Sequence, residues 1–143
     1  MNDIRRNLRM MFVVVLLFIC NKFFVRPYIL ENEFPVVLDI FVLSFPNLCE
    51  AILGGLLLTN ISLFAKYRFL KKPLSITGNH IYLFAVLITA LYVLLQEFKI
   101  HNLGGNNVYD PYDVLFSVIG LLALYFILWY TKPVISFEQE PEK

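Results

Sequence analysis

Hydrophobic residues in this chain gather into four long blocks, and a few ionisable residues interrupt or separate them. The blocks cover approximately residues 8–30, 36–65, 79–98 and 114–130. The hydrocarbon core of a bilayer is about 30 Å thick, and a helix crosses it with about 20 apolar residues. Each block is long enough, and little of the chain is left for a soluble domain. The pattern therefore predicts an all-α integral membrane protein, a single domain of four transmembrane helices.

The second block is too long for one simple crossing. Its 30 residues would extend about 45 Å as a helix, and they include Pro46. Proline is disfavoured inside a helix but suits its first turn, and it pushes Phe45 away from helical geometry. We therefore expect a membrane helix over residues 46–66, preceded by a short interfacial or re-entrant segment at residues 35–45. The other expected elements are three spans and a polar cytoplasmic tail, at residues 8–30, 79–98, 113–131 and 132–143.

The first block has some features of a signal peptide, because three arginines within the first nine residues precede an apolar run. However, Ile19 stands before Cys20, where a cleavage site would need a small residue. The apolar character also resumes after Lys22. We interpret this block as an uncleaved first span.

Composition supports a lipid environment. Hydrophobic residues make up 59% of the chain and charged residues 16%, against about 45–50% and 25% in soluble proteins. No basic tract interleaved with exposed aromatic residues indicates a nucleic-acid partner. Cys20 and Cys49 both lie inside apolar blocks, where free thiols behave as small hydrophobic residues; a disulfide or a metal pair is the alternative.

The distribution of cations predicts the orientation in the membrane. With a cytoplasmic amino terminus, nine cations fall on the inner face and three on the outer face, as the positive-inside rule requires. The inner set is Arg5, Arg6, Arg9, Lys66, Arg68, Lys71, Lys72, Lys132 and Lys143, and the outer set is Lys22, Arg26 and Lys99. Both termini are therefore expected in the cytoplasm.

Acidic and amide side chains gather at the opposite, outer ends of the spans. An ionisable residue at the centre of a span raises the free energy of membrane insertion by roughly 2.5–3.5 kcal/mol. The placement of these side chains at one end of the spans therefore indicates a functional role. We predict that five of these side chains, drawn from three spans, converge in one polar pocket at the outer boundary of the membrane. They are Asn47, Glu50, Gln96, Asp110 and Asp113. Because clustered carboxylates repel, one should be protonated or countered by a cation, with Lys99 and Arg26 as candidates.

Glu50 allows two interpretations. It shares a helix face with Asn47 and Gly54, so it either lines a water-accessible cavity that binds a cation, proton or polar headgroup, or it only locks helix packing through a hydrogen bond. An adjacent stripe of small residues favours close approach of helices. The stripe consists of Ala51, Gly55 and Thr59.

The candidate chemistry favours binding over catalysis. No Ser/His/Asp set, phosphate-binding loop or Cys-x-x-Cys is present, and His101 is without a second ligand at metal spacing, so no metal or cofactor is expected. Asn60 begins a glycosylation sequon, but it falls within a span. We expect a non-enzymatic envelope protein that recognises a polar group at the outer leaflet or acts as an accessory subunit of a membrane complex, with other membrane subunits or a homo-oligomer as partners. The alternative is a metal-assisted enzyme acting on a lipid-linked phosphate, with Glu50 or Asp113 as the base.

Residues 91–125 carry a spaced polar pattern. Gln96 ends a span, Asp110 and Asp113 form an acidic turn, and Gly120 lies in the last span. This pattern resembles the VanZ-like family of small bacterial membrane proteins. This chain departs from the family pattern at three positions: Val93 stands in place of a glutamate, Asn106 and Asn107 in place of an arginine, and Ser117 in place of an asparagine. The resemblance implies a four-span protein of the bacterial cytoplasmic membrane with its polar motif outside, and it implies no defined reaction.

Overall fold

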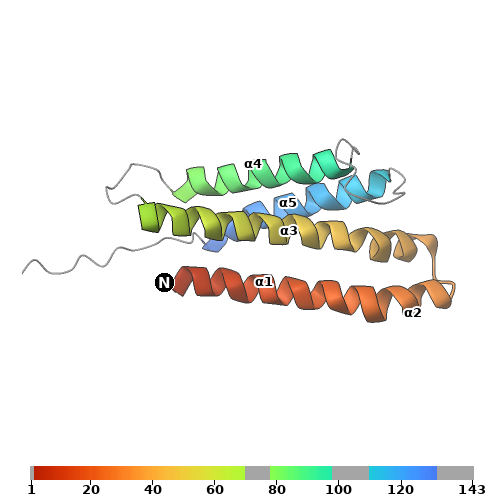
Figure 1. Cartoon of the computed structure of the whole chain (residues 1–143). Helices are drawn as coiled ribbons and strands as arrows, with labels where there is room; N and C mark the ends of the chain where they lie inside the picture. Colours follow the sequence, from red (N-terminus) through yellow and green to blue (C-terminus); the bar gives the residue numbers. More distant parts are fainter. Residues whose placement is uncertain (1, 70–77, 98–109, 132–143) are drawn as a thin grey trace, which may run out of the picture.

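The computed structural model describes residues 2–69, 78–97 and 110–131, which are almost entirely helical (Figure 1). In chain order the elements are α1 (Asn2–Cys20), the π-helical turn η1 (Asn21–Val25), α2 (Arg26–Glu31), α3 (Val36–Phe69), α4 (Gly78–Glu97) and α5 (Pro111–Thr131). Four helical segments are long and apolar enough to cross a membrane. The predicted fold class is confirmed: this is an all-α, multi-pass membrane protein. The predicted tail, residues 132–143, lies outside the described residues.

Helix α3 is the centre of the bundle. It packs against α1 on one side and against α4 and α5 on the other, and α4 also packs against α5. Among the described residues, α1 has no such packing with α4 or α5. Figure 1 shows α1 beside α3, away from α4, with successive long helices running in opposite directions. Helices α3 and α5 therefore run parallel, and both begin at the same end of the bundle. The end of α5 reaches the start of α1, where Arg6 donates a hydrogen bond to the carbonyl of Thr131.

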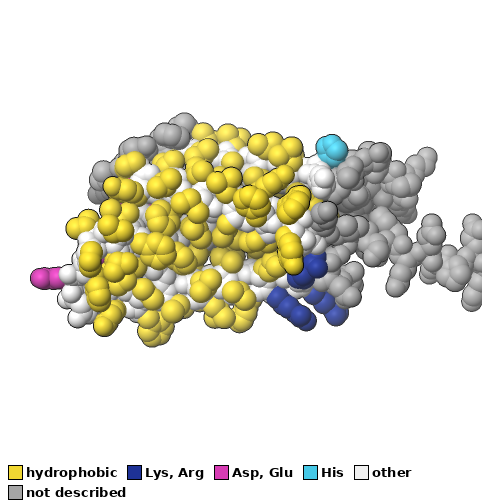
Figure 2. Space-filling model, turned by 180° about the vertical axis from the view of Figure 1, so that it is seen from behind, with side chains coloured by type: hydrophobic (Ala, Val, Ile, Leu, Met, Phe, Trp, Pro, Cys, Tyr) yellow, Lys and Arg dark blue, Asp and Glu magenta, His cyan; other side chains and the backbone are white. Residues whose placement is uncertain are grey.

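The two ends of the bundle differ in charge. Where α1 begins and α3 and α5 end, the described cationic side chains are Arg5, Arg6 and Arg9, and we call this the basic end. Where α3 and α5 begin lies the acidic end, which carries Glu31, Glu33, Asp39, Asp110 and Asp113 together with the cations Lys22 and Arg26. Figure 2 shows a face covered with hydrophobic side chains between a cationic group at one end and an acidic side chain at the other. This is the surface that a lipid bilayer requires.

The prediction that a membrane helix begins at Pro46 was wrong. Helix α3 is continuous over 34 residues, and Pro46 lies inside it. Since a continuous helix makes no reversal at Phe45, the short re-entrant segment does not form. At about 1.5 Å per residue, α3 is longer than the hydrocarbon core is thick, so some of its residues extend beyond that core. An interfacial position for residues 35–45 remains a prediction.

A hydrogen bond from another helix explains why the proline is tolerated. Pro46 has no N–H to donate to the carbonyl of Val42, four residues earlier. The Nδ2 atom of Asn21 donates to that carbonyl instead, at 3.0 Å. Asn21 is buried and begins the π-helical turn η1. The π-helical turn η1 thus contacts the turn of α3 that contains Pro46. The carbonyl of Val42 keeps a hydrogen-bond donor, as a backbone polar group in hydrocarbon must.

Close packing of α3 against α5 depends on glycine. A Cβ atom added at Gly120 would lie 2.6 Å from the carbonyl oxygen of Leu48 and 2.9 Å from the Cβ of Ala51. One turn further, Gly55 faces the fully buried Leu124. The backbones of α3 and α5 therefore touch directly, and this contact fixes the position of the acidic end of α5 relative to α3.

Candidate polar site at the acidic end

The site begins where the apolar core of the three-helix unit stops. Ala51 of α3, Val93 of α4 and Leu121 of α5 form one buried cluster. Asn47 lies four residues before Ala51, and Ser117 lies four residues before Leu121. Because residues four apart share a helix face, the next turn toward the acidic end brings polar residues to the same interior. The core changes from apolar to polar within one turn of α3 and α5.

Two carboxylates lie near this boundary, at different depths. Asp113 of α5 lies one turn above Ser117, whereas Glu50 of α3 directly precedes Ala51 and lies at the level of the apolar cluster. Asp113 is half-buried, and Glu50 is exposed. Within the part of the chain that the structure describes, no lysine or arginine forms an ion pair with either carboxylate. Of the predicted counter-cations, Arg26 is half-buried, and Lys99 lies outside the described residues.

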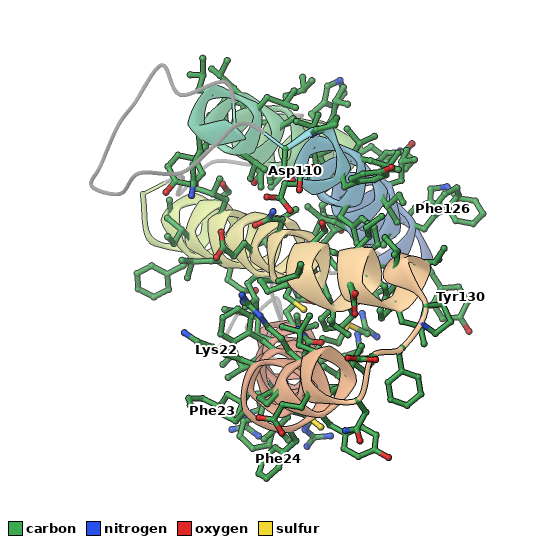
Figure 3. All side chains as sticks on the ribbon, turned by 90° about the vertical axis from the view of Figure 1, so that its right-hand side faces the viewer. Lys22, Phe23, Phe24, Asp110, Phe126 and Tyr130 are labelled. Carbon is green, nitrogen blue, oxygen red and sulfur yellow. The ribbon has the colours of Figure 1, made fainter. Side chains whose placement is uncertain are left out.

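Asp110 has a structural role at the start of α5. Its carboxylate accepts a hydrogen bond from the backbone N–H of Tyr112 at 2.9 Å, and its carbonyl accepts one from Asp113 at 3.2 Å. Figure 3, viewed toward the acidic end, shows Asp110 between the ribbons of α3, α4 and α5. A capping carboxylate at a helix N-terminus is stabilising. Asp110 therefore holds the first turn of α5, and Asp113 with it, at the mouth of the three-helix unit.

The other two predicted pocket residues lie on α3 and α4. Asn47 is half-buried on α3, and Gln96 is exposed in the last turn of α4. Among the described residues, neither side chain has a hydrogen-bond partner. The structure thus places Asp110 and Asp113 at the start of α5, leaves Asn47 half-buried on α3, and leaves Glu50 and Gln96 exposed. Convergence of all five side chains in one pocket stays a prediction.

Sequence reasoning missed two buried hydroxyls near the acidic end, those of Ser44 in α3 and Ser117 in α5, and neither has a hydrogen-bond partner among the described residues. Ser117 is completely buried, and its Oγ has no hydrogen-bond partner among the described residues. It lies one turn below Asp113 on the same face of α5, so its hydroxyl belongs to the wall of the site. An unsatisfied buried hydroxyl costs about 1–3 kcal/mol. In the sequence its only signal is its place in the VanZ-like pattern.

The predicted small-residue stripe is buried at the helix contacts. Ala51, Gly55 and Thr59 all lie inside the bundle, and the Thr59 hydroxyl donates to the carbonyl of Gly55 at 2.8 Å. On the neighbouring face, Gly54 meets the Cγ2 atom of Thr89 in α4. The stripe therefore lies where α3 meets other helices and does not line the polar site.

Helix α1 docks through a second set of polar residues that the sequence analysis did not select. Asn7, Val14 and Asn21 are spaced by seven and are the buried residues among the described side chains of α1 and η1. Asn7 Nδ2 donates to Asn60 Oδ1 at 3.1 Å, and Asn60 Nδ2 donates to Met11 Sδ at 3.6 Å. Asn60 is thus a helix-docking residue. The heptad spacing of the two asparagines was the signal that would have revealed this seam.

Near the basic end, a shallow hollow of about 190 Å³ lies between α4 and α5. Its lining consists of Asn79, Tyr82, Leu83, Tyr125 and Trp129. Amphipathic aromatic residues of this kind gather at membrane–water interfaces, so this hollow fits the boundary level of the bilayer.

The described residues contain no group of three or more His, Cys, Asp or Glu side chains arranged to hold a metal ion. His101 lies outside the described residues. Comparison of the chain with protein families, curated proteins and solved structures found no match.

Proposed function

We propose that this chain is a small cell-envelope membrane protein that recognises a polar group at the outer leaflet without catalysing a reaction. The observation that supports this is the gathering of polar side chains at the acidic end of the three-helix unit, where the half-buried Asp113 lies one turn above the buried Ser117 hydroxyl, which has no partner among the described residues. Such polar groups raise the free energy of a membrane protein unless a ligand, a proton or water compensates. Placing them at the entrance of a three-helix interior suits a binding site.

We further propose that the chain is a VanZ-like protein of the bacterial cytoplasmic membrane, with both termini in the cytoplasm. The cationic side chains at the basic end support this orientation through the positive-inside rule. Topology reporters fused after Lys72 and after Lys143 should report the cytoplasm, and one inserted within residues 104–107 should report the outer side. A reporter at Lys72 that faces outward would contradict the orientation and place the acidic end in the cytoplasm.

Photo-crosslinking in cells tests recognition directly. A photoreactive amino acid replaces Tyr112, which is exposed beside Asp113, or in a matched control Tyr130, which is exposed at the basic end. We expect the lipids crosslinked at Tyr112 to be enriched in one headgroup class relative to the bulk membrane. The enrichment should disappear in the Glu50→Gln, Asp113→Asn double variant, and it should be absent at Tyr130.

Three outcomes would contradict the proposal. If the lipids crosslinked at Tyr112 and at Tyr130 both have the composition of the bulk membrane, the evidence for recognition is absent. A protein adduct at Tyr112 that survives the double variant would favour an accessory subunit of a membrane complex, or a homo-oligomer. Metal-dependent turnover of a lipid phosphate by the purified protein, lost in Asp113→Asn, would favour the enzymatic alternative.

A further inference from the structure

The hollow between α4 and α5 lies at the boundary of the hydrocarbon core. On α4 it is lined by Asn79, Tyr82 and Leu83, which belong to the first turns of that helix. Helix α4 has 20 residues, so at about 1.5 Å per residue it is about as long as the hydrocarbon core is thick. Its first turns, and the hollow with them, therefore lie at the depth where lipid headgroups begin.

The size of the hollow limits what it can hold. Its volume is about 190 Å³, whereas a site that encloses a drug-sized ligand measures about 300–1,000 Å³. Leu83, Tyr125 and Trp129 are each exposed, so the hollow is open at the surface of the bundle. It therefore suits one small group of a larger molecule whose remainder lies outside.

An apolar stripe continues from the hollow along both helices toward the acidic end. It is formed by four side chains, each seven residues from one of the lining residues, and such a spacing keeps residues on one helix face. The four are Val86, Ala90, Val118 and Leu122. The two on α4 are half-buried and the two on α5 are exposed. The molecule that fits is amphipathic, with a polar group in the hollow and an apolar chain along the stripe.

The lining offers hydrogen-bond donors and, among the described residues, no carboxylate. Asn79 carries two amide N–H groups, Tyr125 an O–H and Trp129 an indole N–H. Hydrogen bonds to an ionised acceptor are about twice as strong as those to a neutral one, and amide and phenol side chains commonly hold phosphate oxygens. The three arginines of the basic end add positive charge at the same end of the bundle. Both features favour an anionic polar group.

We propose that the hollow binds the phosphate of a phospholipid in the leaflet at the basic end, while an acyl chain of that lipid lies along the apolar stripe. A phospholipid places a small anionic group at this depth and an apolar chain beneath it, as the hollow and the stripe require. The inference concerns the end of the bundle opposite the proposed recognition site, and it does not depend on the proposed function.

Native mass spectrometry of the full chain, released from detergent with added ligand, tests the inference. Phosphatidylglycerol is compared with diacylglycerol of the same acyl chains, which lacks the phosphate, and with glycerophosphoglycerol, which lacks the chains. We expect each of these to bind at least about tenfold more weakly than phosphatidylglycerol, because the first loses hydrogen bonds to a charged group and the second loses apolar contacts.

Variants assign the binding to the hollow. Leu83→Trp fills it and should abolish the preference for phosphatidylglycerol over diacylglycerol. Leu91→Trp is the matched control, because it places the same side chain at an exposed position about two turns further along α4. Tyr125→Phe removes one donor and should weaken phosphatidylglycerol binding about fivefold, with diacylglycerol unchanged. Tyr92→Phe removes an exposed hydroxyl elsewhere on α4 and should change neither.

Equal affinity of the wild-type chain for phosphatidylglycerol and diacylglycerol would overturn the inference, whatever the folding of the variants. Equal effects of the two tryptophan substitutions would show annular lipid only and would overturn it as well. If glycerophosphoglycerol binds as tightly as the lipid, the site takes a soluble phosphate ester and the acyl chain has no role. None of these results bears on the proposed function, which the crosslinking at Tyr112 tests separately.

Discussion

Helix α3 makes two seams that differ in chemistry. Toward α5 it presents Leu48, Ala51 and Gly55, and the opposing Gly120 lets the two backbones touch. Toward α1 it presents Asn60 and the carbonyl of Val42, each hydrogen-bonded to an asparagine. The first seam is held by close packing of small residues and the second by polar contacts between buried amides. At the basic end, Arg6 adds a hydrogen bond to the carbonyl of Thr131.

The difference reflects how much of each helix is buried. In its most apolar 18-residue window, the first membrane segment has 6% of its residues buried, against 28% in each of the other three. In lipid, apolar contact alone gives helices little reason to associate, so packing and hydrogen bonds decide. Helix α1 has few buried residues, and two of them, Asn7 and Asn21, hydrogen-bond to α3. The α3–α5 seam fixes the polar site, and the α1–α3 seam attaches a helix at its side.

The largest expected effect on stability is the difference between substituting Gly120, in the α3–α5 contact, and substituting Gly54, beside that contact. Gly120→Ala should lower the free energy of unfolding by at least about 2 kcal/mol, because the new Cβ meets the backbone of Leu48. Gly54→Ala is the matched control. Its Cβ would lie 3.3 Å from a side-chain methyl of Thr89, and alanine gains up to about 1 kcal/mol of helix propensity. Its net effect should lie within about 1 kcal/mol of zero. Denaturant unfolding in detergent micelles measures both, and equal effects would contradict the contrast.

An intermediate effect is expected in the polar seam. Asn7→Val leaves the Asn60 amide without its partner and should cost about 1–2 kcal/mol of unfolding free energy. Asn60→Val should cost a similar amount. The double variant should cost less than the sum of the two, with a coupling of about 0.6 kcal/mol, the average for hydrogen bonds between membrane helices, and at most about 1.7 kcal/mol. The same unfolding measurement completes this cycle. Strictly additive costs would show that the asparagine pair does not hold α1.

The smallest effect concerns Asn21 and Pro46. Asn21→Ala should cost about 1 kcal/mol of unfolding free energy, because the carbonyl of Val42 loses its donor. In a Pro46→Ala background, the restored N–H of residue 46 satisfies that carbonyl within α3. The same Asn21 substitution should then cost less than half as much. An unchanged cost in both backgrounds would mean that Asn21 contributes through packing instead.

The polar site was partly predictable from the sequence. The one-sided placement of acidic residues and the i, i+3 relation of Asn47 and Glu50 follow from hydropathy and helix periodicity alone. The position of Asp113 beside α3 depends on α5 lying parallel and close to α3, which the Gly120 contact determines. Ser117 carries no hydropathy signal, since a single serine in an apolar span is common and becomes informative only when its burial is known.

The sequence by itself determined the four membrane helices, their order and the segregation of charge, because the bilayer restricts apolar blocks of this length to very few structures. Only the tertiary structure decided the course of α3 through Pro46. A proline breaks a helix by removing one N–H, and that cost depends on whether a neighbouring helix supplies another donor. Asn21, 25 positions earlier in the chain, supplies it. The two seams depend on tertiary structure in the same way. The local sequence determines which face of a helix carries small or polar residues, and the helix packed against that face determines which contacts and hydrogen bonds those residues make.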